Sequence, residues 1–341
     1  MSETIMQTQT AVGKTLALCD PEEEYAQLMT DYLKKQKNLP WELRTYTNVQ
    51  ELLESELETV ALFVVAESAY VEEFQQFAPA RLVVLNESGL MRWENIIYVD
   101  KYQKAENVLR VLLEAYMEIA DNPLPRLQKN CKTVFIGNYS PVHRSMQTSM
   151  ALTLSQLLAK EHPTLYLNFE HYAGIAELIP DMQTHDMADL LYFLNTEKER
   201  FRLRFQSMLK HIGSLDYIPP MKSGQNLLTV TPTEWLGLFE KIEELGEYEY
   251  VVLDLSESMQ GLFQILRLCR KVFTVTREDR IAQSKLLQYE QLLSLCECGD
   301  VLDKTRRLSL SHIRRLPEEL EQLTKGDLAE LVKGLMKEIM E

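Results

Sequence analysis

Glycine is scarce in this sequence. Only 12 of its 341 residues are glycine, and none lies between Asn138 and Ala159. This stretch connects a predicted buried strand to a predicted helix, where a phosphate-binding loop would sit in a nucleotide-binding α/β protein. Such a loop uses glycines to bring backbone N–H groups onto phosphate oxygens, and a lysine to reach the β- and γ-phosphates. The stretch has no lysine before Lys160, so the sequence predicts the frame of a phosphate loop without its chemistry.

Cysteines and long apolar runs are scarce too. Five scattered cysteines, an odd number, favour reduced thiols in a cytoplasm over a disulfide framework. No segment approaches about 18 uninterrupted apolar residues, so no transmembrane helix is expected. The polar start MSETIMQTQT lacks the basic and apolar regions of a secretory signal. We therefore expect a cytoplasmic protein without direct membrane insertion.

Positive charge is in deficit, with 36 Lys and Arg against 51 Asp and Glu and a formal net charge of −15. Residues 1–125 hold 10 Lys and Arg against 21 Asp and Glu, a net −11, which leaves −4 for the rest. Phosphate neutralisation dominates affinity for nucleic acid, so this balance argues against a nucleic-acid partner. Two basic stretches, 199–211 and 304–315, read as solvated helix faces or as contacts with an acidic partner.

The length suggests two domains. The clearest boundary is EIADNPLPRLQKNCK (118–132), where two prolines and polar residues end a helical pattern before a new strand. We expect a first domain over 1–121, a linker over 122–131 and a second domain over 132–341. In both domains, apolar strands alternate with helical stretches, which predicts doubly wound α/β architecture with parallel sheets.

The first domain has five predicted strands, which favours a flavodoxin-like order. It resembles the receiver domain of two-component signalling. The resemblance places Asp20 and Glu22 at the acidic Mg²⁺ cluster, Ala66 at the phosphoacceptor aspartate, Asn86 at the hydroxyl position and Lys101 at the conserved lysine. The segment ESGLMRWEN between the fourth and fifth strands is too short for a normal helix.

An aspartyl phosphate needs a carboxylate nucleophile, and Ala66 cannot supply one. We therefore interpret the first domain as a pseudo-receiver that keeps the fold and has lost the phosphorelay. A working receiver with its acceptor shifted to Glu67 is the alternative.

The second domain resembles the deviant Walker A ATPases of the MinD/ParA group, which have a P-loop NTPase fold and a loop that reads KGGxGKT/S. The segment VHRSMQTS (142–149) aligns with that loop. Val142 then replaces the signature lysine, while His143, Arg144 and Met146 replace glycines. A plain strand–helix connection in an unrelated α/β fold, or a glycine-free anion site, remain alternatives for this segment.

The same alignment puts Gln147 in place of the P-loop lysine and keeps Thr148 at the Mg²⁺ hydroxyl position. In TLYLNFE, Asn168 and Glu170 stand on the strand whose aspartates serve catalysis in that group. Asp254, at the end of YEYVVLDL, is retained on the Walker B-like strand. We identify no catalytic residue and no metal-ligand set.

Across almost its whole length the chain resembles the TadZ/CpaE-like proteins of Tad (type IVb) pilus loci. The residues that carry this are DKYQKAENVL, SPVHRSMQTSMAL, TLYLNFEHYAG, YEYVVLDL with CRKVFTVT, and LPEELEQL with GDLAELV. The resemblance implies a cytoplasmic, often dimeric protein that marks or organises a pilus assembly site. It also implies recruitment to a membrane assembly site, with pilus or secretion machinery proteins as partners.

We therefore predict a non-catalytic scaffold or localisation factor, a pseudo-ATPase that needs no cofactor. The alternative is a MinD/ParA-like ATPase that binds or weakly hydrolyses ATP with Mg²⁺ through an unusual phosphate loop. The amphipathic C-terminal stretch DLAELVKGLMKEIME has mixed charges on its polar face, so we expect it to pack onto its own domain rather than onto a membrane.

Overall fold

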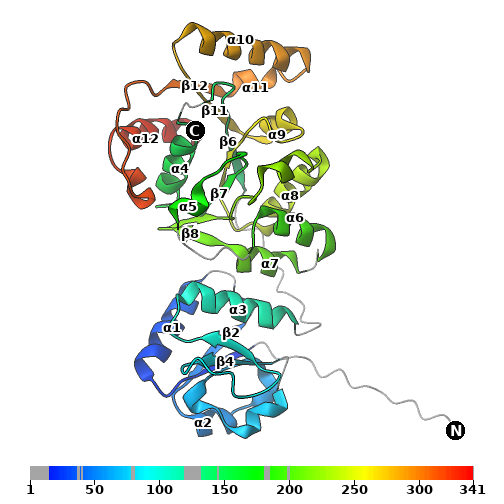
Figure 1. Cartoon of the computed structure of the whole chain (residues 1–341), viewed down its shortest axis with the longest axis vertical. Helices are drawn as coiled ribbons and strands as arrows, with labels where there is room; N and C mark the ends of the chain where they lie inside the picture. Colours follow the sequence, from blue (N-terminus) through cyan, green and yellow to red (C-terminus); the bar gives the residue numbers. More distant parts are fainter. Residues whose placement is uncertain are drawn as a thin grey trace, which may run out of the picture. The chain divides into compact units, whose positions relative to one another are not determined.

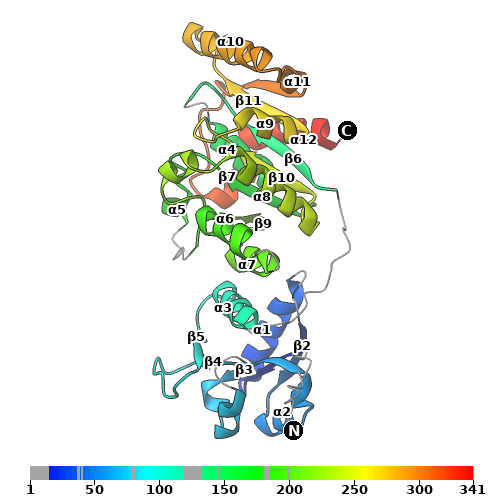
Figure 2. The same ribbon diagram turned by 90° about the vertical axis from the view of Figure 1, so that its right-hand side faces the viewer.

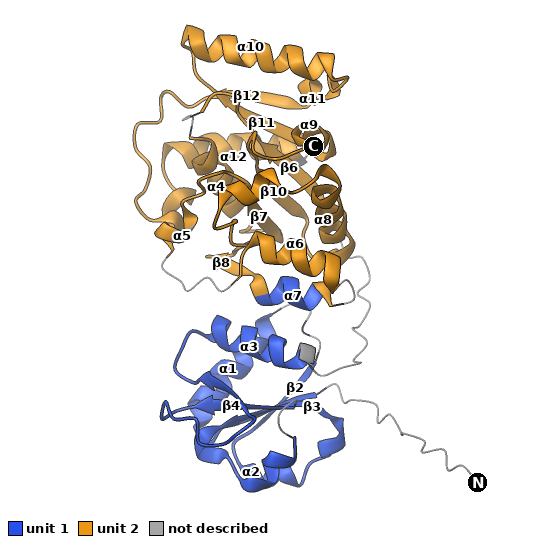
Figure 3. Cartoon of the chain, turned by 45° about the vertical axis from the view of Figure 1, so that its right-hand side comes forward, with its two compact units in different colours: residues 1–126, 202–207 blue, residues 127–201, 208–341 orange. Residues whose placement is uncertain are grey.

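The computed structural model describes residues 15–36, 39, 41–77, 81–118, 132–143, 146–179, 185–197 and 200–340. Figures 1 and 2 show the ribbon from two sides. The chain divides into two compact units (Figure 3). Unit 1 comprises residues 1–126 together with 202–207, and unit 2 comprises 127–201 and 208–341. Each unit is built on its own parallel sheet, so the α/β class expected from the sequence is confirmed.

The sheet of unit 1 has the order β2-β1-β3-β4-β5, and all of its pairings are parallel. This is the 2-1-3-4-5 order of flavodoxin-like folds, as the strand pattern predicted. Its strands are β1 (Thr15–Cys19), β2 (Glu42–Tyr46), β3 (Val60–Ala66), β4 (Leu82–Asn86) and β5 (Ile97–Asp100). The central strand β3 is buried at all seven positions, because helices or turns cover both of its faces.

One face of this sheet packs against α1 (Glu23–Lys35) and α3 (Ala105–Glu118). The other face packs against α2 (Val49–Leu53) and the 3₁₀ turns η1 (Leu57–Thr59), η2 (Glu67–Ala69) and η3 (Glu72–Phe77). Residues 87–96 link β4 to β5 without a helix. The expectation that this link is too short for one is therefore confirmed.

The sheet of unit 2 has the order β12-β11-β6-β10-β7-β9-β8. Its strands are β6 (Val134–Asn138), β7 (Thr164–Asn168), β8 (Lys210–Ile212), β9 (Leu215–Tyr217), β10 (Tyr250–Asp254), β11 (Lys271–Thr276) and β12 (Thr305–Ser309). All pairings are parallel except that of β8, which forms an antiparallel hairpin with β9 at one edge.

Two elements of this sheet correct the sequence-based prediction. The stretch 199–211 was expected to be a helix face, yet β8 begins at Lys210. The stretch 304–315 was expected to be a helix face too, yet β12 occupies 305–309. Both are edge strands, and β12 has exposed arginines, so neither shows the apolar run of a buried parallel strand. The interpretation of 304–315 as a helix face is therefore wrong.

The helices that follow β6 along the chain are α4 (Gln147–Leu158), α5 (Ile175–Leu178), α6 (Met187–Thr196), α7 (Phe201–Met208), α8 (Pro232–Leu245), α9 (Leu262–Leu268), α10 (Arg280–Leu295), α11 (Asp300–Asp303) and α12 (Asp327–Met340), with 3₁₀ turns η4 (Gly224–Leu228) and η5 (Leu320–Thr324). Most of α7 is assigned to unit 1. Helix α4 is buried along nearly its whole length, between the sheet and α12.

The C-terminal helix α12 contributes Leu328, Val332 and Ile339 to the same buried cluster as α4. Packing of this helix onto its own domain, expected from its mixed polar face, is confirmed. Within the described ranges, no helix is long and apolar enough to cross a membrane.

Candidate functional site

Three polar residues end three neighbouring strands of unit 2 in register. Asp254 on β10 is paired with Asn138 on β6 and with Asn168 on β7. Side chains two residues apart on a strand share a face, so these three lie on the face of Val252 and Tyr166, which pack with α4. All three are at most 2% exposed. The sequence alone indicated Asp254 and Asn168; Asn138 was missed, although its place at a strand end before the loop was the available signal.

The side chain of Gln147, in the first turn of α4, points toward the strand-end residues Asp254 and Asn138. Its Nε2 donates to Asp254 Oδ1 at 2.6 Å, to the carbonyl of Leu255 at 2.9 Å and to that of Asn138 at 3.3 Å. The residue that stands where a P-loop lysine would reach phosphate therefore faces the protein interior. It closes the space between α4 and the strand ends.

The second oxygen of Asp254 is also occupied. The hydroxyl of Tyr166 donates to Oδ2 at 3.0 Å, and Asn168 Nδ2 donates to it at 3.1 Å. Burial first, and then the neighbouring carboxylate of Glu170, raise the pKa of Asp254 to about 7, against the opposing effect of these hydrogen bonds. Tyr166 was missed by the sequence reading, because a tyrosine within a buried strand is usually a core residue.

Thr148, at the predicted Mg²⁺ hydroxyl position, lies next to the carboxyls of Glu170 and Asp254 and lowers the pKa of both. Burial nevertheless raises the pKa of Glu170 above its usual value. His143 is exposed, with its Nε2 3.2 Å from Glu257 Oε1, and its charge acts to lower the pKa of Glu170. Arg144 lies outside the described residues.

Two residues of the loop before α4, Ser140 and Val142, are packed against the protein. Ser140 is buried and donates to the carbonyl of Val275 at 2.5 Å, and Val142 is 5% exposed. Met146 has φ 62° and ψ 30°, a left-handed conformation that favours glycine. The chain thus keeps a glycine-type turn at the start of α4 but fills it with a side chain.

These residues do not fit Mg²⁺ and ATP. The Asp254 carboxylate accepts hydrogen bonds on both oxygens, Gln147 stands at the position aligned with the P-loop lysine, and Met146 carries a side chain at the left-handed turn before α4. In the part of the chain that the structure describes, no group of three or more His, Cys, Asp or Glu side chains could hold a metal ion.

Unit 1 contains a second cluster of charged residues, centred on Lys101. Its ammonium is 1% exposed and contacts Asp20 at 2.9 Å, Glu22 at 3.0 Å and Glu87 at 2.8 Å. Burial opposes the charge of Lys101, but its hydrogen bonds to these three carboxylates raise its pKa above the usual value. The structure brings together Asp20, Glu22 and Lys101, which the receiver resemblance assigns to one site. Glu87, directly after β4, was missed.

Ala66 and Asn86 end β3 and β4, while the Lys101 ammonium contacts Asp20, Glu22 and Glu87. Asn86 instead accepts from Gly89 N at 2.8 Å. Glu67 accepts from the backbone of Glu87 and Ser88 and from the Ser88 hydroxyl at 2.7–2.9 Å. Burial would raise the pKa of Glu67, but these hydrogen bonds lower it. A carboxylate held this way stabilises the loop after β4.

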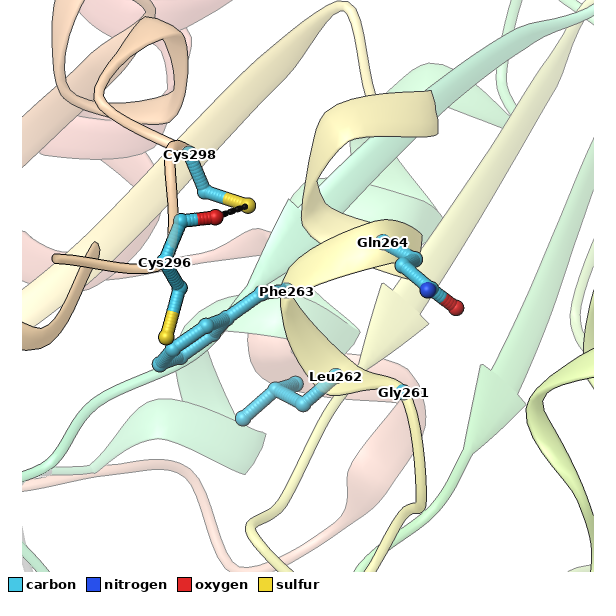
Figure 4. Close-up of a pocket in the computed structure, with 6 residues that line it drawn as sticks. All are labelled: Gly261, Leu262, Phe263, Gln264, Cys296 and Cys298. Carbon is cyan, nitrogen blue, oxygen red and sulfur yellow. Dashed lines mark hydrogen bonds between the residues drawn. The ribbon is translucent and has the colours of Figure 1, made fainter. Parts of the chain in front are cut away.

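A separate pocket of about 370 Å³ lies at the start of α9. It is lined by Gly261, Leu262, Phe263, Gln264, Cys296 and Cys298 (Figure 4). The Cys298 thiol donates to the carbonyl of Cys296 at 3.3 Å. None of the strand-end residues around Asp254 lines this pocket.

No protein-family profile matches the chain, and no curated protein matches it in sequence. Solved structures do resemble it. A ParA family ATPase from Chlorobium tepidum is 17% identical over 59% of this chain and 89% of that chain, with a TM-score of 0.44. A plasmid partition protein from Borrelia burgdorferi is 15% identical over 61% and 99%, with a TM-score of 0.43.

The MinC:MinD cell division protein complex of Aquifex aeolicus is 15% identical over 59% of this chain and 78% of that chain, with a TM-score of 0.40. At these identities and TM-scores, the likenesses carry no argument about activity.

Proposed function

We propose that this protein is a non-catalytic scaffold that acts through protein–protein contacts. The single observation that carries the proposal is the inward turn of Gln147 onto Asp254. That contact joins the start of α4 to the end of β10, where a phosphate and its metal would otherwise have to enter. A P-loop binds phosphate through N–H groups that point at the ligand. Here the side-chain N–H groups of Gln147 are instead hydrogen-bonded within the protein.

Unit 1 supports the same proposal. A phosphoacceptor carboxylate is absent at Ala66, and Lys101 is already bound by three carboxylates. The nearby Glu67 is held by hydrogen bonds from Ser88 and Glu87, so it is not free to act as a nucleophile. Both units thus keep an α/β frame whose former reaction centre is filled by internal contacts.

The finer role we propose follows the TadZ/CpaE resemblance: a localisation factor, dimeric and cytoplasmic, that organises a Tad pilus or related assembly site. Its partners would be pilus or secretion machinery proteins. The resemblance in residues such as SPVHRSMQTSMAL and TLYLNFEHYAG supports this role.

Calorimetric titration of the full chain with ATP and Mg²⁺ tests the non-catalytic part. We expect no binding heat up to millimolar ATP, and no phosphate release above the rate of a boiled sample. The variant Gln147→Ala is measured alongside, because it removes the side chain that closes the site. Saturable, Mg²⁺-dependent binding by the wild-type protein, lost in Asp254→Ala, would replace the scaffold with the ATP-binding alternative.

The pilus role needs a separate test. Deletion of the gene in its own host should scatter or abolish the pilus assembly sites, and the Asp254→Asn variant should restore them because no ATP chemistry is required. Normal assembly sites in the deletion strain would contradict this role while leaving the ATP result unaffected.

A further inference from the structure

Helix α10 carries an unusual amount of exposed apolar surface. Ile281 is 71% exposed, Leu292 is 44% exposed and Leu295 is 78% exposed. The helix lies at the outer side of unit 2, with one flank uncovered by other elements of that unit (Figures 1 and 2). A different face of α10 packs against the unit and buries Ala282, Leu286, Tyr289 and Leu293. The exposed leucines and isoleucine are therefore not needed for the core.

The exposed side chains form a regular seam. The α10 seam consists of Ile281, Lys285, Gln288, Leu292 and Leu295, all of which are exposed. Their spacings of four, three, four and three residues are those of the a and d positions of a coiled coil. At 100° per residue the seam runs along one flank of α10, about 120° from the buried stripe. Leu287, 56% exposed, lies on the other flank.

The pattern of the seam is complementary to itself in an antiparallel pair. If two α10 helices pair antiparallel so that each a position faces a d position, Ile281 of one copy contacts Leu292 of the other. By symmetry, this contact occurs twice in the pair. Between the two apolar layers, Lys285 meets Gln288 of the other copy, also twice. A parallel pair would instead place Lys285 against Lys285, which costs energy through like-charge repulsion.

The pocket of Figure 4 extends the apolar surface beyond the end of the seam. Cys296 is the C-cap of α10 and follows Leu295 directly. Phe263, on the pocket wall, contacts the Tyr289 ring with 6.1 Å between centroids. Leu262 and Phe263 thus lie at the end of α10 that an antiparallel second helix would reach with its first turn (Figure 4).

We propose that the α10 seam is a homodimer interface in which two copies of this chain pack their α10 helices antiparallel. The arrangement is isologous, because the same surface is used by both copies. One helix pair buries less than the roughly 800 Å² per partner of a standard interface. The dimer is therefore weak, with a dissociation constant on the order of 1–100 µM, and it forms without nucleotide.

Sedimentation of the full chain from 1 to about 500 µM, without nucleotide, tests this proposal. We expect a monomer–dimer equilibrium for the wild-type protein. Leu292→Lys and Ile281→Lys should each raise the dissociation constant at least about tenfold, because each places a charge in an apolar layer twice per dimer. Leu287→Lys is the matched control, with an equally exposed leucine on the other flank, and should leave the constant unchanged.

Cross-linking tests the orientation. In a Cys296→Ser background, the double variant Ile281→Cys with Leu292→Cys should give a covalent dimer on mild oxidation, while Ile281→Cys alone should not. Covalent dimers from the single variant would show a parallel pair and overturn the proposal. So would a wild-type protein that stays monomeric over the whole range, or a dimer that Leu287→Lys weakens as much as Leu292→Lys.

Discussion

At the scale of single residues, the start of α4 in unit 2 is joined to the ends of the neighbouring strands by hydrogen bonds from one side chain. Gln147 is short enough and neutral enough to bond Asp254 and two backbone carbonyls at once. A lysine at this position would bring a charge and a longer stem. Asp254, at the end of β10, accepts hydrogen bonds from Gln147, Tyr166 and Asn168.

The buried carboxyl of Asp254 leads to a prediction about pH. Its pKa is raised from 3.8 to about 7 in the folded protein, so the folded state holds a proton that the unfolded state releases over this interval. Asp254 therefore makes the free energy of unfolding fall as pH rises from about 4 to about 7, by up to about 1.4 kcal/mol per pH unit. Asp254→Asn removes this titration.

Chemical unfolding of wild type and Asp254→Asn at several pH values measures the effect. The variant should gain stability relative to wild type as pH rises from about 4 to about 7, and the difference should be constant above that range. A difference that does not change with pH would show that Asp254 titrates normally.

Lys101 gives a second prediction at this scale. Lys101→Met removes the one ammonium among three carboxylates, one of which, Asp20, is fully buried. Loss of one partner from a buried ion pair costs about 3–5 kcal/mol, because the remaining charge is left uncompensated. We expect a drop of that size in the free energy of unfolding of unit 1, measured by denaturant titration. Lys104→Met, at an exposed position, is the control; equal effects of the two variants would contradict the buried network.

At the scale of elements, the sequence predicted what periodicity and burial determine. The parallel strands β6, β7, β10 and β11 were found because strands buried on both faces read as apolar runs. The edge strands β8 and β12 were missed, because the basic, half-exposed TRRLS has no such run. Side chains that meet only in three dimensions were equally out of reach: nothing in the chain order links Glu87 to Lys101 or Tyr166 to Asp254.

The start of η4 gives a prediction about how the loop after β7 is held. A Cβ on Gly224 would lie 2.3 Å from the carbonyl oxygen and 2.8 Å from the Cα of His171. Because both are backbone atoms, the loop would have to move. Gly224→Ala should lower the free energy of unfolding by about 3 kcal/mol or more.

Gly237, inside α8, is the matched control, because a Cβ there meets nothing within 4 Å. Gly237→Ala should stabilise the protein by up to about 1 kcal/mol, since alanine is the better helix former. Thermal and denaturant unfolding of the two variants would decide, and similar effects of both would contradict the close contact at His171.

At the scale of the whole molecule, charge governs which partners are possible. The formal net charge is −15, and the exposed arginines of β12 are already paired: Arg306 with Glu338 at 3.6 Å and Arg307 with Glu290. The basic stretch at 304–315 is thus partly neutralised by α12 and α10. It offers less free positive charge than its sequence alone indicates.

The last prediction follows from this balance. Binding to duplex DNA depends on lysines and arginines that replace counterions along the phosphates, and it is strongest at low salt. We expect no change in the fluorescence anisotropy of a labelled random-sequence duplex at 50 mM salt or below, up to about 10 µM protein, because non-specific sites on basic proteins already bind in that range. In the double variant Glu290→Gln with Glu338→Gln, Arg306 and Arg307 lose their acidic partners. This variant tests whether these ion pairs prevent DNA binding. Saturable binding by the wild-type protein, weakening steeply with salt, would contradict the prediction and would mean that the basic stretches form a continuous surface despite the net charge.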